Sequence, residues 1–254
     1  MVDSISRFNT RVESYAKYRP TYPHVVIDVL TANCGLSEDG IVADVGSGTG
    51  ILSELFLKRG NTVFGVEPNA QMRATAEALM DSYPQFNSVD GTAEATTLDA
   101  GSVDLVTAAQ AFHWFDRARA RLEFTRILKP NGWVALLWNE RRLDSTPFLR
   151  AYEQLMLQYG TDYEKVRHEN VTSHIQDFFA PQGFREESFD NIQNFDFDGL
   201  KGRVLSSSYA PGPDHPNFES MMAALRKIFD SYQRSGTIAF EYDTRLYYGR
   251  LKSG

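Results

Sequence analysis

The stretch ADVGSGTG, residues 43–50, places three glycines within five residues, directly after a run of apolar residues. Glycine permits a positive φ in a tight turn, and because it has no Cβ it lets a ligand approach the backbone. An acidic residue, Asp44, precedes the first glycine by two positions. A glycine loop between a strand and a helix is typical of a nucleotide-type ligand site, and a turn without a ligand is the alternative.

The spacing of the glycines separates the candidate ligands. Gly46, Gly48 and Gly50 give G-x-G-x-G, whereas the dinucleotide fingerprint G-x-G-x-x-G would need a glycine where Ile51 stands. No Lys-Ser or Lys-Thr pair follows, so the Walker pattern for phosphate binding also fails. An NAD(P)-dependent oxidoreductase is therefore the weaker hypothesis, although a glycine pattern alone discriminates poorly.

A second signal comes from Glu67, at the end of the next apolar segment and 21 residues after Gly46. A carboxylate there can accept hydrogen bonds from both hydroxyls of a ribose, because it has two oxygens that only accept. The alternative is a solvated acid at a helix start, where the helix dipole favours it. Together with the glycine loop, Glu67 favours ligand binding.

Apolar segments of strand length alternate with segments of helix length through the first 140 residues. Because these strands are apolar throughout, we expect a parallel sheet covered by helices on both faces, an α/β fold. The expected strands are 41–46, 62–67, 102–110 and 133–139, and the expected helices are 23–34, 51–60, 68–83 and 116–132.

The rhythm changes after about residue 140, but no linker rich in Pro, Gly or Ser separates a second domain. Helices are expected at 146–159 and 214–234, and 237–251 reads as a late antiparallel edge strand. We therefore predict a single domain over 1–254 with an added cap. Its parts are a core at about 24–145, late strands at about 184–197 and 237–251, and a cap from about 1–23, 161–180 and 198–235.

Composition narrows the class of protein further. The chain has 254 residues and a formal net charge of -7, without a dense Lys/Arg stretch, which argues against a nucleic-acid partner. The single cysteine, Cys34, excludes an internal disulfide. His168 and His174 are six apart, off the spacing of a helical zinc site, so no metal is expected.

The start of the sequence, MVDSISRFNTRVESY, has no apolar segment typical of a secretory signal. The longest apolar stretches, such as WVALLW, are too short to cross a bilayer. We therefore expect a cytoplasmic protein without a membrane partner, either a monomer or a homodimer.

Five segments in order carry a family resemblance: IVADVGSGTG, VFGVEPNAQM, DGTAEATTL, SVDLVTAAQAFHWFD and ILKPNGWVALLW. Together they resemble the class I S-adenosylmethionine-dependent methyltransferases across residues 41–138. Within that class the chain is similar to the type 11 branch, which includes small-molecule enzymes of the trans-aconitate and ubiquinone-pathway kinds. The segment FNTRVESYAKYRPTYP, residues 8–23, is similar to the lead segment of that branch.

The resemblance implies a Rossmann-like, seven-stranded, mostly parallel sheet. Its strand order would be 3-2-1-4-5-7-6 with the last strand antiparallel, helices on both faces and a helical cap. The implied cofactor is S-adenosyl-L-methionine. Its methyl group is activated for in-line displacement, so the protein mainly positions the acceptor and excludes water.

The resemblance also implies cofactor contacts along the chain. The loop backbone would pack on the methionine part, Asp44 would orient the loop, Glu67 would hold the ribose, and Gln110 would meet the methionine amine. Thr92 stands where many relatives have Asp to accept from the adenine amine, and a hydroxyl accepts more weakly. The full implied set is Tyr15, Arg19, Asp44, Gly46, Ser47, Gly48, Gly50, Glu67, Pro68, Met72, Thr92, Ala93 and Gln110.

On the acceptor side, His113 in AFHWF follows the fourth strand. It is a candidate base or substrate anchor, and the alternative is a histidine that only shapes an aromatic cluster. Tyr209, in the expected cap, is a second candidate catalytic residue. Arg141 and Arg142 could hold an anionic substrate, with a solvated pair as the alternative. The candidate substrate-binding residues are Tyr18, Trp114, Trp138 and Arg141.

These features predict an enzyme that methylates a small molecule, with oxygen as the favoured acceptor and a carboxylate among the candidates. AQAFHWF, residues 109–115, stands where adenine- or amide-methylating relatives carry Asn/Asp-Pro-Pro-aromatic, which argues against DNA. An oxidoreductase and a non-catalytic S-adenosylmethionine-binding protein are the alternatives.

Overall fold

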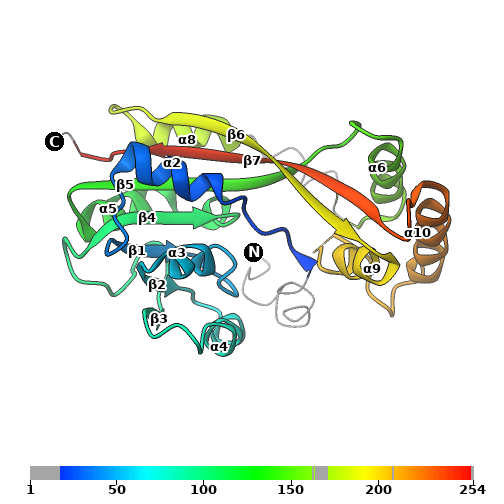
Figure 1. The fold of residues 1–254 in the computed structure, drawn as a ribbon, viewed down its shortest axis with the longest axis horizontal. Coiled ribbons are helices and arrows are strands. Elements are labelled where there is room, and N and C mark those ends of the chain that lie inside the picture. Colours follow the sequence, from blue (N-terminus) through cyan, green and yellow to red (C-terminus); the bar gives the residue numbers. More distant parts are fainter. Residues whose placement is uncertain (1–17, 162, 164–170, 208, 253–254) are drawn as a thin grey trace.

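The computed structural model describes residues 18–161, 163, 171–207 and 209–252. Seven strands form one sheet in the order β3-β2-β1-β4-β5-β7-β6, so the predicted topology is confirmed (Figure 1). Tyr15, a predicted cofactor contact, lies outside the described residues, as does His168. Within the described part, no helix is long and apolar enough to span a bilayer.

The first five strands are parallel, and β7 is antiparallel to both of its neighbours. We expected 237–251 at the edge of the sheet, but β7 lies between β5 and β6, and β6 is the edge strand. The strands are β1 Ile41–Val45, β2 Thr62–Val66, β3 Phe86–Val89, β4 Val103–Ala109, β5 Leu128–Arg141, β6 Arg185–Phe195 and β7 Ile238–Gly249.

Two strand boundaries escaped the sequence pattern. β3 is a four-residue edge strand with exposed Asn87 and Ser88, so it shows no apolar run. β5 begins at Leu128, five residues before the expected start, and its pairing with β4 shifts register so that Val103 faces Leu128 and Leu105 faces Trp133. A bulge of this kind admits the residues that read as a turn from sequence.

Helices cover the sheet as the apolar strands required. They are α2 Val25–Cys34, α3 Ser53–Arg59, α4 Ala70–Leu79, α5 Arg117–Ile127, α6 Pro147–Tyr159, α8 Val171–Phe179, α9 Phe197–Leu205 and α10 Phe218–Tyr232, with a 3-10 turn η1 at Phe112–Trp114. One face packs Leu30 of α2 and Phe56 of α3 onto Val42 and Leu105. The other packs Phe124 of α5 onto the strands.

α8 packs on the sheet and is not part of the cap. We expected 161–180 to be cap material, yet Ile175, Phe178 and Phe179 are buried in the same core cluster as Phe124. The Phe178 ring meets the Phe124 ring edge-on, with 6.0 Å between centroids. The difference arises because that segment shows its apolar face only at helical spacing, which does not reveal what it packs against.

The ends of β6 and β7 continue beyond the parallel sheet and carry a separate helical layer (Figure 1). Against them pack α6, α9 and α10, which we call the cap. Its own buried cluster includes Tyr152, Leu200, Leu225 and Phe240. The cap is therefore held by the antiparallel part of the sheet, beyond the carboxyl end of β5.

A short extended segment, residues 18–22, joins the sheet to the cap and is called the lead segment here. Its carbonyls at Thr21 and Arg19 accept hydrogen bonds from Asn139 (3.2 Å) and Gln193 (3.3 Å). Arg19 donates to the carbonyl of Ser206, at the end of α9 (3.1 Å). The lead segment thus lies across the β5–β7–β6 ribbon.

Glu123 of α5 anchors the loop that follows β3, and its loss tests that anchoring. Its carboxylate accepts from the Thr96 N–H (2.8 Å), the Thr96 hydroxyl and Arg126, and these partners hold its pKa near 2, with Arg126 contributing most. Glu123→Ala leaves the buried Thr96 donors unsatisfied, so we expect about 2–3 kcal/mol of lost stability in urea denaturation.

The matched control is Glu54→Ala, because Glu54 forms an exposed ion pair with Lys58 on α3. Such a pair contributes little, so this variant should change the free energy of unfolding by about 0.5 kcal/mol or less. Equal losses in both variants would contradict an anchoring role for Glu123.

Candidate active site

The glycine loop after β1 requires glycine for two separate reasons. Gly46, Gly48 and Gly50 have φ values of +69°, +57° and +85°, which residues with a Cβ rarely adopt. A Cβ at Gly46 would also lie 2.6 Å from the Cβ of Ala111, closer than packing allows. The loop therefore exposes bare backbone where β1 and β4 part, the point at which ligands bind in open α/β sheets.

Asp44 lies under this loop, fully buried at the end of β1. Its carboxylate accepts from the hydroxyls of Ser53 (2.7 Å) and Thr107 (3.0 Å). Burial raises its pKa to about 6, although both hydroxyls oppose that shift. Asp44 thus ties the loop, the start of α3 and β4 together from below.

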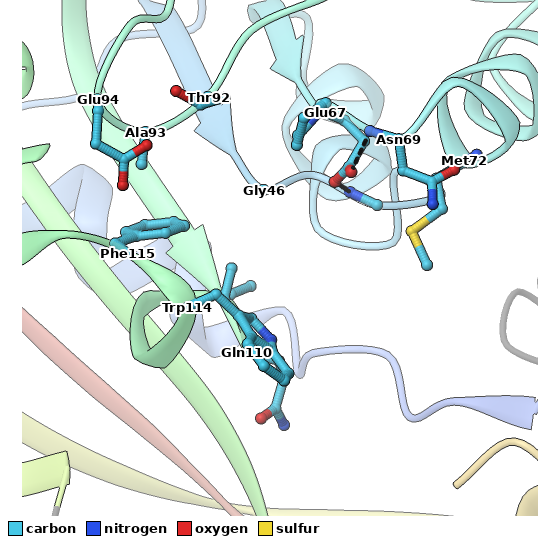
Figure 2. A pocket seen from close by; sticks show the side chains of 14 residues that line it. Gly46, Glu67, Asn69, Met72, Thr92, Ala93, Glu94, Gln110, Trp114 and Phe115 are labelled. Atoms are coloured by element: carbon cyan, nitrogen blue, oxygen red, sulfur yellow. Dashed lines mark hydrogen bonds between the residues drawn. The ribbon is translucent and has the colours of Figure 1, made fainter. Parts of the chain in front are cut away.

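Glu67 follows β2 and bridges the glycine loop to α4. Its carboxylate accepts from the N–H of Gly48 (3.0 Å) and of Asn69 (2.9 Å), as Figure 2 shows. Burial raises its pKa above the ordinary value. Asn69 then caps α4 by accepting from the N–H groups of Gln71 and Met72 (3.0 and 3.1 Å).

These elements surround a cavity of about 240 Å³. It brings together nine of the residues predicted from sequence: Gly46, Gly48, Glu67, Pro68, Met72, Thr92, Ala93, Gln110 and Trp114. Figure 2 shows Glu67 and Met72 on one side of it, with Phe115 and Trp114 on another. Asp44, Ser47 and Gly50 were also predicted, but they are not among the residues that line it.

Sequence reasoning missed two polar residues of the lining, Asn69 and Glu94. Asn69 carried a readable signal, because Asn immediately before a helix is a preferred cap. Glu94 carried no such signal, because only the path of the loop after β3 brings it to the cavity. Its carboxylate accepts from the Asp116 N–H (2.8 Å), which joins that loop to the start of α5.

The segment after β4 forms the opposite rim of the cavity. Gln110 has a φ of +56°, and its side chain donates to the carbonyl of Asn139 (3.1 Å). His113 lies in η1 with its ring 4.7 Å from that of Trp114, and it is not among the lining residues. Trp114 is 47% exposed, so this wall is open to solvent at its outer end.

Several predicted substrate residues lie away from the cavity. Trp138 is only 7% exposed, and its ring packs edge-on against Phe112 and Tyr247 in the sheet core. Its position on β5 points it toward the α8 face. A packing role therefore explains Trp138 better than substrate contact.

Other predicted residues gather in the cap or the lead segment. Arg141 is buried in an ion pair with Glu153, and Tyr209 packs its ring 4.9 Å from that of Tyr163. Tyr18 lies directly on the backbone of Gly202 in α9. These residues lie in the cap and the lead segment and are not among the residues that line the cavity.

Arg142, the second arginine considered from sequence, points elsewhere. It forms ion pairs with Asp190 and Asp243 on the neighbouring strands. Its charge is therefore matched by local carboxylates.

Comparison with known proteins agrees with this geometry. Residues 43–136 match the protein family described as "Methyltransferase domain". These residues are therefore similar to a methyltransferase domain. An uncharacterized methyltransferase of Mycobacterium bovis is 40% identical over 134 residues, which is 53% of this chain and 52% of that protein. The chain thus spans about half the length of such curated relatives.

Broader matches extend over most of the chain. An uncharacterized methyltransferase of Schizosaccharomyces pombe is 28% identical over 90% of this chain and 89% of its own length. A putative type II methyltransferase of Anaeromyxobacter dehalogenans has a TM-score of 0.68 at 21% identity, covering 92% and 98%. A Thiobacillus denitrificans methyltransferase, solved with S-adenosyl-L-homocysteine, has a TM-score of 0.53 at 16% identity, covering 95% and 97%.

The buried carboxyl of Asp44 predicts a specific pH dependence of the ligand-free protein. An unfolded aspartate has a pKa near 3.9, so between about pH 4 and 6 the unfolded chain releases this proton more readily than the folded one. Stability is therefore lost as pH rises through that window, by about 3 kcal/mol for a shift of about two units. Asp44→Asn should remove this part of the pH dependence.

Urea denaturation at several pH values from 4 to 7 measures the difference between the variant and the wild type. Asp28→Asn, at an exposed position on α2, is the control and should keep the wild-type profile. A profile for Asp44→Asn parallel to that of the wild type would contradict the assignment.

Proposed function

We propose that this protein is an S-adenosylmethionine-dependent methyltransferase that acts on a small molecule. The observation that carries the proposal is that the backbone of Gly46 and Gly48 and the buried carboxylate of Glu67 line the same cavity. These residues lie in the segment that matches a methyltransferase domain. The Thiobacillus neighbour that holds S-adenosyl-L-homocysteine supports the same cofactor class.

The residues present fit this cofactor. Gly46 and Gly48 leave room beside the backbone for its methionine part, since a Cβ would fill that space or strain the loop. Glu67 would accept from the ribose hydroxyls, an acceptor-only group being matched to two donors. Met72, a soft thioether on α4, suits a flat adenine ring, and Thr92 lies at the opposite wall.

The bound cofactor supplies an activated methyl group for in-line displacement. The chain's own part is to hold the acceptor in line and exclude water, which converts an encounter into an oriented reaction. Trp114 and Phe115 give this rim an apolar wall. A carboxylate acceptor needs no base, whereas an alcohol would, and His113 in η1 is the candidate for that role.

Oxygen is the acceptor atom we favour, and a carboxylate is the acceptor group we place first. The cationic residues of the cap and lead segment, including Arg19 and Arg203, support an acidic acceptor. The net charge of -7 and the absence of a dense basic stretch argue against a nucleic-acid substrate.

Cofactor binding is tested by Glu67→Gln with S-adenosyl-L-homocysteine in isothermal titration. The amide removes the negative charge and one acceptor, so we expect affinity to fall about 10- to 100-fold, in line with the loss of a charged hydrogen bond. Glu77→Gln, exposed on the same helix α4, is the control and should bind like the wild type. Tight binding of NADH without binding of S-adenosyl-L-homocysteine would instead favour an oxidoreductase.

The acceptor is tested by methyl transfer from tritiated cofactor into a small-metabolite extract, followed by mild base. A methyl ester releases volatile methanol, so we expect base-labile counts. His113→Asn should then lower turnover by no more than a few-fold, because no proton has to be removed. Base-stable counts, with a large loss of turnover in His113→Asn, would instead mean an acceptor that needs a base. Cofactor binding without any transfer would favour a non-catalytic binding protein.

A further inference from the structure

The cap buries an arginine whose charge no carboxylate of the described residues matches. Arg203 of α9 is 5% exposed. Its Nε donates to the Tyr242 hydroxyl (3.0 Å) and its Nη1 donates to the Ser207 hydroxyl (2.9 Å). Its guanidinium also lies 5.5 Å from the centre of the Phe240 ring. These partners are neutral, so they orient the charge without cancelling it.

The surrounding groups make the region more positive. Arg141 is buried nearby and paired with Glu153, while the lead segment brings Arg19 to the end of α9. Burial alone would raise the pKa of the Tyr209 phenol, yet Arg203, Arg19 and Arg141, together with a hydrogen bond from Ser207, hold it below its ordinary value. The field at Tyr209 is therefore that of net positive charge.

An uncompensated buried charge is a cost to the fold. Taking an ion out of water costs several kcal/mol unless an opposite charge joins it, and apolar residues of similar size often stabilise a protein more. Arg203 lies beside Phe240, and Leu200 and Val204 of the same helix belong to the buried apolar cluster of the cap, so an apolar side chain would suit this position. A ligand that brings its own negative charge would offset this cost.

The region lies within reach of the methyltransferase cavity. Gln110, on the cavity rim, donates to the carbonyl of Asn139 on β5. Two residues farther along that strand is Arg141, which pairs in register with Tyr242, the partner of Arg203. Two residues of a strand span about 7 Å, so Arg141 lies about that far along β5 from the residue that Gln110 contacts.

The lead segment is hydrogen-bonded to β5 and β6 in the region between the cavity rim and the cap. Asn139 donates to Thr21, and Gln193 of β6 donates to the Arg19 carbonyl (3.3 Å). This places the lead segment over the same ribbon that presents Tyr242. The lead segment therefore connects β5, which reaches the cavity rim, with β6 and, through Arg19, with the end of α9.

We infer that Arg203, held by Tyr242 and Ser207, binds an anionic group of the methyl acceptor, either a carboxylate or a phosphate. This inference rests on the proposed function for the identity of the ligand as an acceptor. The acceptor is then at least bifunctional. One anionic group is anchored in the cap, and a separate nucleophilic atom reaches the cavity. Arg203 thereby takes the anchoring role that the sequence suggested for Arg141, whose charge Glu153 already matches.

Titration of small anions into the protein tests this assignment directly. The probes are glutarate, its neutral diamide, and inorganic phosphate, each at constant ionic strength and with saturating S-adenosyl-L-homocysteine. We expect the wild type to bind glutarate or phosphate and not the diamide, and the stronger of the two anions identifies the anionic group. Failure of both anions to bind the wild type would overturn the inference.

Two variants of Arg203 and one control locate the binding. Arg203→Met should weaken anion binding at least 10-fold. Arg203→Lys, which keeps the charge but not the forked donors, should fall between Met and wild type. If the Met variant does not fold, the Lys variant decides. Arg234→Met, at an exposed position before β7, should bind like the wild type. Undiminished anion binding in the folded Arg203 variants would overturn the inference.

Binding of S-adenosyl-L-homocysteine, measured in every variant, separates this inference from the proposed function. Arg203→Met should leave that affinity within about twofold of wild type, because Arg203 is not among the cavity residues. A wild type that binds the cofactor product but no anion would defeat only the inference. A wild type that binds neither would defeat both, and one that binds the anion alone would defeat the proposed function.

Discussion

The carboxylate of Glu67 connects the glycine loop to the start of α4, and the geometry of the site depends on that connection. It accepts one hydrogen bond from the glycine loop at Gly48 and one from the start of α4 at Asn69. Both N–H groups lie at loop positions that no strand pairing holds. The Glu67 carboxylate therefore helps to hold the positive-φ loop, together with the Val66 carbonyl, which accepts from the N–H groups of Gly46 and Ser47. Asp44 provides the matching support from below.

Much of this arrangement could be predicted from sequence because its constraints are local. Three glycines after an apolar strand predicted the loop, and the acid after the next strand was predicted to accept from a ribose. The bridge from that acid to Gly48 and Asn69 is seen only in the structure. Where burial depends on distant segments, prediction was weaker. β3 has too few apolar residues to be recognised as a strand, and the apolar face of α8 does not indicate which element it packs against. Trp138 was predicted to contact substrate because no local pattern shows that Phe112 and Tyr247 pack over it.

The charged residues inside the cap were equally hard to predict from sequence. Its helices were expected, yet the charges inside it depend on pairings between β5 and β7 that only the fold determines. Arg141 and Tyr242 are about a hundred residues apart in sequence and meet in register. That register leaves Arg141 with Glu153 and leaves Arg203 among hydroxyls and a ring. The surroundings of both arginines therefore depend on long-range strand pairing, which no local motif reveals.

A crystal structure with S-adenosyl-L-homocysteine would show whether Glu67 holds the ribose of the cofactor. We expect the ribose hydroxyls within hydrogen-bond distance, about 2.5–3.0 Å, of the Glu67 carboxylate. We also expect the homocysteine part along Gly46 and Gly48 and the adenine beside Met72. A cavity that stays empty at saturating ligand, or a ribose placed away from Glu67, would contradict this expectation.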